Sequence, residues 1–303
     1  MITSSPDTFL HAFARLPAST PSTARAAFLV TPTGFAPAAE SARDNAYMQL
    51  SAAVDASRAH AQHRELAAAL REDLPVIVFP GDAATPEAVF PNNVFATRPG
   101  TLIVGRMHHA VRRAEAGRED IRNFFSGVLG YRLIDLSARE DLVAELTGVL
   151  VIDHARGVGF CGMSERCDEA GARAMHEAFG LALTFCFDLA PGEYHTNVLL
   201  TCLAGRGAIL ATDGFLDPAV PEAIGTAYAG RVITLDPEQK SGYAGNAITL
   251  SADRVWMSEA ALASLTAVQR GDLEDWGFAI GAVALDEIEK AGGSLRCCVA
   301  EIF

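Results

Sequence analysis

Short apolar runs bounded by turn residues dominate the chain, and they alternate with fewer stretches that have helical periodicity. Runs rich in Val, Ile, Leu and Phe predict buried strands where Gly, Pro or Asn bounds them. The predicted strands are 26–30, 75–79, 101–106, 132–136, 147–153, 157–162, 182–187, 198–203, 207–212, 232–235, 247–251, 254–258, 278–284 and 299–302. The predicted helices are 8–16, 41–71, 115–129, 168–179, 218–229, 259–270 and 286–291.

The order of these elements repeats along the chain. A strand, its hairpin partner, a helix and a further strand recur about five times at intervals of roughly 50 residues, which favours radial repetition of one unit. A doubly wound parallel sheet is the alternative. Tight turns join many adjacent strands, as in hairpins, and no G-x-G-x-x-G motif follows the first strand. The pattern therefore predicts an α/β fold built from repeated units.

Composition and charge narrow the class of protein. Half of the 303 residues are hydrophobic, which is enough for a sizeable core, and the formal net charge is −13. A strongly acidic chain with only one short basic cluster, residues 106–113, argues against a nucleic-acid partner. No basic-then-apolar leader and no membrane-length apolar run is present. We expect a cytoplasmic protein without a membrane partner, and a homo-oligomer is left open.

The six cysteines include one candidate nucleophile. None of them forms a C-x-x-C pair or has histidines at zinc-finger spacing, so free thiols are expected and no metal site is predicted. Cys297 follows Gly292-Gly293-Ser294 and Arg296, at the predicted junction of a turn and the last strand. A neighbouring cation stabilises a thiolate, and glycines let a ligand approach. On this segment alone, a buried structural thiol is the stronger interpretation.

Polar residues at the ends of other predicted strands could complete such a site. His195 follows a Pro-Gly turn at the head of an apolar run, and Glu145 comes just before the strongest strand signal. Arg166 ends a hairpin loop, and an arginine can bind a carboxylate through two hydrogen bonds. Asn92 and Asn93 interrupt an apolar segment and fit either a turn or a pocket. For His195, a structural role is an equal alternative on position alone.

The motifs taken together resemble the guanidine-modifying (pentein) superfamily of arginine deiminases, dimethylarginine dimethylaminohydrolases and amidinotransferases. The resemblance extends from about residue 26 to residue 303, and the most similar members are citrulline-utilisation-type hydrolases. It is carried by Phe90-Pro91-Asn92-Asn93, the Glu-x-Thr-Gly segment at Glu145, Ser164-Glu165-Arg166, Tyr194-His195-Thr196-Asn197-Val198 and Gly292 to Cys297. It implies a five-bladed α/β propeller of pseudo-fivefold ββαβ units. A single catalytic domain, 25–303, would then follow a lead-in, 1–24.

The resemblance also implies a mechanism that uses no metal and no organic cofactor. Cys297 attacks the central carbon of a guanidino or ureido group, and His195 protonates the departing amine and then activates water. Glu145 holds His195 and the substrate nitrogens. Arg166 and Arg106 fix the carboxylate of a small amino-acid substrate. Cys298 is expected to be a packing residue.

One departure from the family pattern bears on the substrate. Many relatives have acidic residues where this chain has Asn92, Asn93 and Asn197, and neutral amides pair less strongly with a cation. We therefore expect a neutral, citrulline-like substrate, with Asn92, Asn93 and Asn197 in substrate binding. An arginine or methylarginine hydrolase remains open because Glu145, Asp82 and Glu87 supply carboxylates. The motifs also leave open amidino transfer to an amine. A non-catalytic ligand-binding propeller, as a different class of function, would have an incomplete triad, and the presence of Cys297, His195 and Glu145 in family order argues against it.

Overall fold

The strands of the protein form five separate small sheets, none of which closes on itself, in a computed structural model that describes residues 1–303. In spatial order the sheets are β1(Ile2–Thr3)-β9(Leu183–Asp188)-β8(Val158–Met163)-β7(Leu150–Asp153), β10(Leu200–Cys202)-β11(Ala208–Ala211)-β12(Val232–Leu235), β13(Arg254–Ser258)-β14(Ala279–Val283), β15(Ala300–Ile302)-β2(Ala26–Val30)-β3(Val76–Phe79) and β4(Phe95–Arg98)-β5(Thr101–Val104)-β6(Arg132–Asp135). This is a mixed α/β fold.

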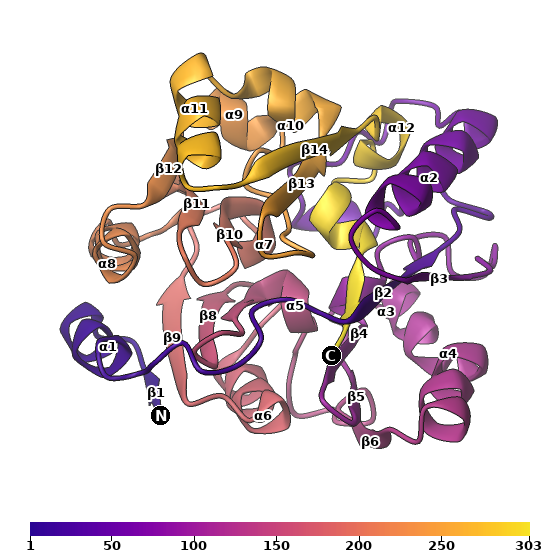
Figure 1. Cartoon of the computed structure of the whole chain (residues 1–303). Helices are drawn as coiled ribbons and strands as arrows, with labels where there is room; N and C mark the ends of the chain where they lie inside the picture. Colours follow the sequence, from indigo (N-terminus) through magenta and orange to yellow (C-terminus); the bar gives the residue numbers. More distant parts are fainter.

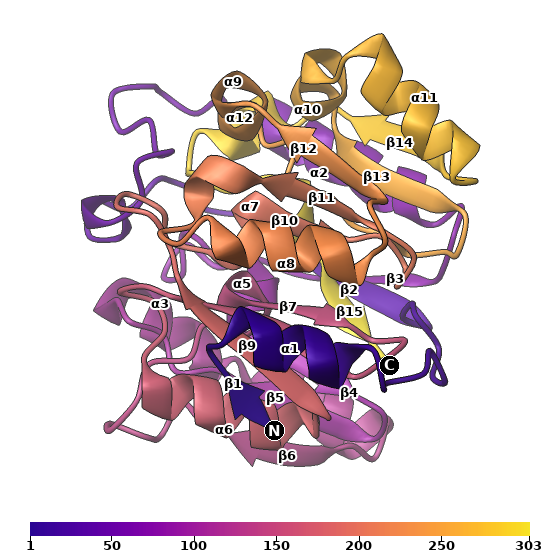
Figure 2. The ribbon, with the colours of Figure 1, turned by 90° about the vertical axis from the view of Figure 1, so that its left-hand side faces the viewer.

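Helices lie on the outside of the sheets, and short helical turns lie near the middle of the molecule (Figures 1 and 2). The helices are α1(Pro6–Phe13), α2(Ala56–Leu70), α3(Ala110–Arg113), α4(Glu119–Asn123), α5(Leu146–Val149), α6(Glu169–Phe179), α7(Thr196–Leu199), α8(Ala219–Ala227), α9(Pro237–Ser241), α10(Glu259–Ser264), α11(Ala267–Asp275) and α12(Asp286–Glu289). Of these, α5 and α7 are single turns that face the centre.

Four of the five sheets contain the same unit of strands. An antiparallel pair is followed by a helix and a third strand that pairs in parallel, as in β4-β5-β6, β7-β8-β9, β10-β11-β12 and β15-β2-β3. In the fifth sheet β13 and β14 are parallel, and a single bridge between Ile248 and Trp256 replaces the predicted strand 247–251. The predicted order of elements is therefore present, although the predicted strand 247–251 is reduced to that single bridge.

Helical turns replace the beginnings of several predicted strands. The predicted strand 147–153 divides into α5 and β7, and 198–203 divides into α7 and β10. Equivalent turns, Pro91–Asn93 and Leu295–Cys298, precede β4 and β15, so Cys297 lies in a turn. Polar side chains in one turn donate hydrogen bonds to backbone carbonyl groups of the preceding turn, and these long-range contacts outweigh the strand propensity of Val and Thr.

Two predicted helices are shorter than the sequence suggested. The region 41–71 contains only the short 3-10 turn Ser41–Arg43 and α2, which begins where it does because the Asp55 side chain caps it by accepting from the Arg58 amide. The residues before α2, 38–55, form a largely irregular segment that crosses one end of the molecule and is called the strap below. The region 115–129 breaks after Gly117, where Arg118 adopts an extended conformation, so that only α4 and a wide turn follow.

The largest core cluster lies between the sheets of β7–β9 and β10–β12. The amino-terminal helix α1 belongs to it, since Phe9 is fully buried and stacks on Phe185 with ring centroids 4.4 Å apart. The strand β1 extends the same sheet by pairing with β9. The lead-in therefore packs on the rest of the chain.

None of the helices has the length and apolar character that crossing a membrane requires.

Candidate active site

The central turns bring most of the candidate residues to one small pocket. Its lining includes Asn93, Arg166, His195 and Cys297, which come from four different sheet units, with Ser41, Asn45 and Met48 of the strap above them. The free volume is only about 20 Å³, far below the roughly 300 Å³ or more of ligand pockets. Entry of an amino acid therefore requires part of this lining to move.

Cys297 is almost fully buried at the bottom of this pocket. Its sulfur accepts a hydrogen bond from Asn246 Nδ2 at 3.3 Å and lies 3.8 Å from Asn197 Oδ1. Burial raises the pKa of the Cys297 thiol, and the contacts with Ser294 and Asn246 offset this only in part. The resting state is therefore the neutral thiol, which a base must deprotonate before it can attack.

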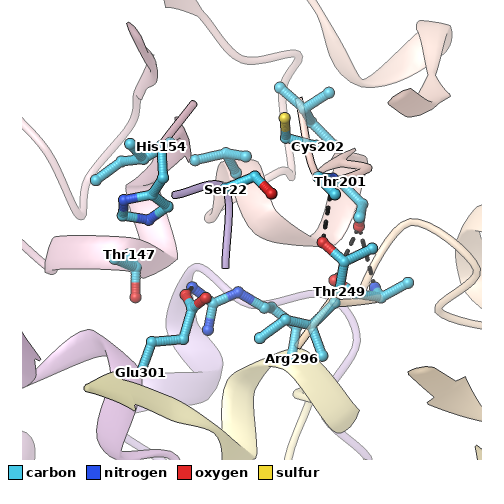
Figure 3. Close-up of a pocket in the computed structure, with 14 residues that line it drawn as sticks. Ser22, Thr147, His154, Thr201, Cys202, Thr249, Arg296 and Glu301 are labelled. Atoms are coloured by element: carbon cyan, nitrogen blue, oxygen red, sulfur yellow. Dashed lines mark hydrogen bonds and ion pairs between the residues drawn. The ribbon is translucent and has the colours of Figure 1, made fainter. Parts of the chain in front are cut away.

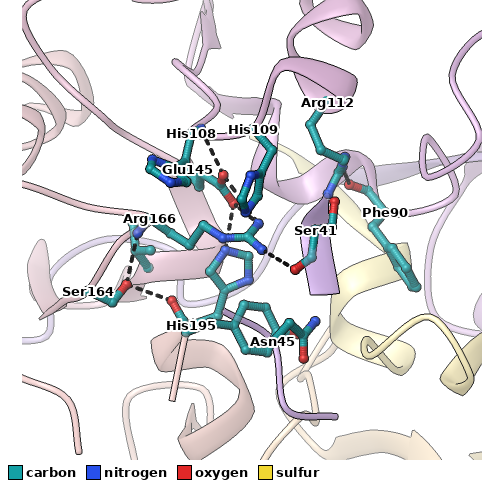
Figure 4. A network of polar contacts seen from close by, with 12 residues as sticks. Ser41, Asn45, Phe90, His108, His109, Arg112, Glu145, Ser164, Arg166 and His195 are labelled. Atoms are coloured by element: carbon teal, nitrogen blue, oxygen red, sulfur yellow. Dashed lines mark hydrogen bonds and ion pairs between the residues drawn. The ribbon is translucent and has the colours of Figure 1, made fainter. Parts of the chain in front are cut away.

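The imidazole of His195 is held by Glu145 within a buried polar network (Figure 4). His195 Nε2 lies 2.8 Å from Glu145 Oε2, and the His108 backbone amide donates to Glu145 Oε1 at 3.0 Å. Both side chains are at most 1% exposed. Burial alone would raise the pKa of the Glu145 carboxyl, but Arg166 and His195 together lower it, so Glu145 is ionised.

The ionised Glu145 sets the tautomer of His195. A carboxylate can only accept, so Nε2 carries the hydrogen and Nδ1 has a free lone pair. Burial lowers the pKa of His195, and the hydrogen bond to Glu145 opposes this without cancelling it. Nδ1 has no partner in the protein although it is buried. A neutral imidazole with an open nitrogen can accept a proton from a thiol in the same pocket.

The Arg166 side chain belongs to the same polar network as His195 and Glu145. Arg166 donates from Nη1 to Glu145 Oε2 at 3.2 Å and from Nη2 to the Ser41 carbonyl at 3.0 Å. Its Nε and Nη2 also bind both carboxylate oxygens of Asp44 on the strap. Arg166 therefore links the strap to the carboxylate of Glu145, and it lines the pocket as the sequence suggested.

The second predicted arginine is not in the pocket. Arg106 donates to the Ser137 carbonyl at 3.0 Å and is absent from the pocket lining. Its backbone pairs with Ala144, which fixes it on the outer side of the Glu145 segment. Arg112 lines the pocket instead; it is 3% exposed and donates to the Phe90 carbonyl and to Glu115. The sequence contained both arginines in one basic cluster and did not distinguish them.

The predicted asparagines occupy three different environments. Asn93 lines the pocket, with its Oδ1 unpaired. Asn197 donates to the Thr147 carbonyl at 3.1 Å and turns its Oδ1 toward the sulfur. Asn92 is fully buried outside the lining, and neither atom of its side-chain amide has a partner. Glu87, one of the carboxylates that the sequence left open, lines the pocket 4.0 Å from Arg112.

Arg296 contributes to a second cavity rather than to the sulfur. Its guanidinium donates to the Val299 carbonyl and forms an ion pair with Glu301 at 2.9 Å. Both side chains line a cavity of about 40 Å³ with His154 and several hydroxyls (Figure 3). Arg296 therefore makes no hydrogen bond to the sulfur. Its charge still lowers the pKa of the Cys297 thiol, as expected of the adjacent cation, but less than the contacts with Ser294 and Asn246 do. No group of three or more His, Cys, Asp or Glu side chains is arranged to hold a metal ion.

Gly148 is predicted to be essential for the position of the imidazole. A Cβ atom at this residue would lie 2.7–2.9 Å from three ring atoms of His195, closer than van der Waals contact permits. We expect the methyl group of Gly148→Ala to displace the imidazole ring of His195 and to lower kcat on the order of 10²-fold, with a smaller change in KM. Steady-state kinetics together with a melting curve measures this. A variant with normal kcat would mean that the ring has room to shift without loss.

Comparisons with known proteins give one family and a set of solved structures. The model of the family described as eukaryotic N,N-dimethylarginine dimethylhydrolase matches residues 31–303. No curated protein matches the sequence. The amino-terminal domain of ArgZ, an arginine dihydrolase from the ornithine–ammonia cycle in cyanobacteria, is 18% identical with a TM-score of 0.78, covering 91% of this chain and 97% of that chain.

Further solved structures share the fold. A mutant of AgrE in complex with L-arginine is 18% identical with a TM-score of 0.79, covering 92% of this chain and 40% of that chain. A mutant of dimethylarginine dimethylaminohydrolase, as an adduct with S-methyl-L-thiocitrulline, is 19% identical with a TM-score of 0.71, covering 92% of this chain and all of that chain. At these identities the likeness establishes the fold.

Proposed function

The chain belongs to the family of the eukaryotic N,N-dimethylarginine dimethylhydrolases, within the pentein superfamily of guanidine-modifying enzymes, and on that premise we propose that it hydrolyses the guanidino or ureido group of a small amino acid through a covalent intermediate on Cys297. The structural neighbours include an arginine dihydrolase and a dimethylarginine dimethylaminohydrolase, both of which are hydrolases of C–N bonds in amidino groups. The observation that carries the proposal is the pocket that Cys297 shares with His195, whose ring is held by Glu145.

The side chains can move protons in the order that this reaction requires. His195 Nδ1 takes the proton of the Cys297 thiol, and the thiolate attacks the central carbon of the substrate group. The C–N bond then breaks while His195 returns that proton to the departing nitrogen, which leaves as ammonia or an amine. Water attacks the thioether carbon and gives a proton to His195. The C–S bond breaks, and the thiolate leaves with the proton of His195 to restore the thiol.

The buried network supports these steps electrostatically. The carboxylate of Glu145 stabilises the imidazolium that exists between the two proton transfers. The Arg166 guanidinium prevents Glu145 from taking the proton itself, because it favours the ionised carboxylate. The thiol and the imidazole are both neutral at rest, so charge separation is deferred until a substrate fills the pocket and excludes water.

The cationic side chains of the pocket suit the carboxylate of an amino acid. Arg166 and Arg112 line it from two sides. Arg166 already binds the Asp44 carboxylate through two nitrogens, which is the geometry that a substrate carboxylate would use. We therefore replace Arg106 by Arg112 as the second binding residue, and we expect strap movement to release Arg166 from Asp44.

Two substrate classes fit the other side of the pocket. The neutral amides of Asn93 and Asn197 favour a ureido group, such as that of citrulline, because an amide both donates and accepts. The carboxylate of Glu87 at the pocket wall favours a cationic guanidinium, as in arginine or a methylarginine. Arginine complexes among the structural neighbours support the second class equally.

We also infer that the five sheets are the blades of a propeller. Four of them repeat the same ββαβ unit, and the neighbours with TM-scores of 0.71–0.79 share the fold. The site residues then come from the inner ends of successive blades.

A substrate panel tests the function directly. Arginine, mono- and dimethylarginine, citrulline and a guanidino acid lacking the α-amino group are incubated with the enzyme, and ammonia or amine release is measured with and without an added amine acceptor. The proposal requires turnover of at least one compound without acceptor. Faster release from arginine than from citrulline would reject the neutral substrate, acceptor-dependent release would indicate amidino transfer, and no turnover at all would favour a binding protein.

A further inference from the structure

The central turns place one residue of each at the same distance from the following strand. Asn92, Thr147, Asn197 and Cys297 each lie three residues before the first residue of β4, β7, β10 and β15. The fifth unit supplies Asn246 from its glycine-rich turn, directly before Ala247. The proposed nucleophile thus takes a position that amides and a hydroxyl occupy in the other units.

Hydrogen bonds connect these residues in chain order. Thr147 Oγ1 donates to the Asn92 carbonyl at 3.0 Å, and Asn197 Nδ2 donates to the Thr147 carbonyl at 3.1 Å. Asn246 Nδ2 donates to the Asn197 carbonyl at 2.8 Å. Each side chain therefore fastens its turn to the preceding one.

The series ends at the sulfur of Cys297. Asn246 Nδ2 lies 3.3 Å from Sγ, and an amide nitrogen carries two hydrogens, one for the Asn197 carbonyl and one for the sulfur. Asn246 is fully buried, and its Oδ1 has no partner in the protein. The same nitrogen also lies 3.4 Å from Asn197 Oδ1, a longer contact than the one to the Asn197 carbonyl. The orientation of the amide is therefore set by Asn197 and the sulfur together.

We propose that Asn246 is a positioning residue for Cys297, whose side-chain amide holds the sulfur at the pocket floor and stabilises its anionic form by a hydrogen bond. The proposal rests on the assignment of Cys297 as the nucleophile. Asn246 is the side chain that donates to this sulfur, since Arg296 is bound to Glu301 and Val299. The other polar neighbour, Asn197 Oδ1, accepts from the thiol and repels a thiolate.

The environment makes this one donor important. The sulfur is 2% exposed, so water cannot replace a missing hydrogen bond. Hydrogen bonds to charged groups are worth about 1.5–3 kcal/mol, which corresponds to one or two orders of magnitude in the fraction of thiolate. A purely structural role for Asn246, in which only the bond to the Asn197 carbonyl matters, would leave that fraction unchanged.

Alkylation of Cys297 separates the two roles. The rate of carbamidomethylation by iodoacetamide is measured against pH by mass spectrometry of the carboxy-terminal peptide, for the wild type, Asn246→Ala and Asn246→Asp. Alkylation follows the thiolate fraction. We expect the midpoint to rise in both variants, and by at least about one pH unit, or tenfold in rate below the midpoint, in Asn246→Asp, where a carboxylate faces the sulfur.

Thr147→Val is the matched control. It removes an equivalent link, the bond to the Asn92 carbonyl, without touching the sulfur, so its melting temperature should fall while the alkylation midpoint stays in place. If the Asn246 variants also lose only thermal stability, the positioning role is refuted. The assay needs no turnover, so a shifted midpoint combined with an inactive substrate panel would reject the proposed function and keep the role of Asn246.

Discussion

Replacing Cys297 with serine is expected to lower kcat on the order of 10³-fold or more while leaving substrate binding within a few-fold. A serine hydroxyl in this buried pocket is a far weaker acid than the thiol, and the imidazole of His195 cannot generate the alkoxide to a useful extent. The initial rate of ammonia or amine release measures the loss. Mass spectrometry of the quenched wild-type enzyme should show a mass increase on the carboxy-terminal peptide that the variant lacks.

The neighbouring thiol provides the control for this experiment. Cys298 is fully buried in the core cluster that also contains Val299 and Leu295, and burial raises its pKa well above the ordinary value. We expect Cys298→Ser to keep kcat within about threefold and to lower stability by about 1 kcal/mol. A Cys297→Ser enzyme that retains turnover, or a Cys298→Ser enzyme that loses it while folded, would move the nucleophile to Cys298.

That most of the candidate residues share one pocket was predictable, because each lies in a short motif at the start of an apolar run. His195 and Glu145 stand at the heads of the segments that become α7-β10 and α5-β7, so the chain itself carries them to the centre. What the sequence could not give is the conformation of those segments. Thr147, Val149 and Val198 favour strands, and the helical turns form only because side chains of one unit hydrogen-bond to the carbonyls of another.

Residues whose role depends on a distant partner were missed for the same reason. Asn246 ends the glycine-rich segment 242–246, and only the fold brings it within 3.3 Å of a sulfur 51 residues away. The strap has the pattern of one long helix with the segment that follows it, but Asp44 is held by Arg166 from 122 residues away. Local periodicity contains no trace of such contacts. The repeated position three residues before β4, β7, β10 and β15 does not include Asn246 and depends on strand starts that the sequence did not predict, so it offered no signal either.

Neutralising Glu145 is expected to damage both activity and stability. In Glu145→Gln the amide can no longer stabilise the imidazolium, and its nitrogen can face His195 and reverse the tautomer, so that Nδ1 carries the hydrogen. We expect kcat to fall on the order of 10²–10³-fold. Loss of the charged hydrogen bonds to His195 and Arg166 should lower the free energy of unfolding by about 1.5–3 kcal/mol. Steady-state kinetics and chemical denaturation measure the two effects.

The pH dependence of that stability loss distinguishes an ionised Glu145 from a neutral one. The pKa of Glu145 is lowered in the folded protein from an ordinary value of 4.5, so its contribution is complete above that value and disappears only as the pH falls through the lower folded value. The stability difference between wild type and Glu145→Gln should therefore be constant from about pH 6.5 to 7.5, where His195, whose pKa is below its ordinary 6.5, is neutral in both proteins. Glu301→Gln, which removes a buried Glu–Arg pair away from His195, should cost stability without the loss in kcat. Should Glu145→Gln retain kcat as Glu301→Gln does, the carboxylate would only tie Arg166 and the strap in place, and His195 would act without it.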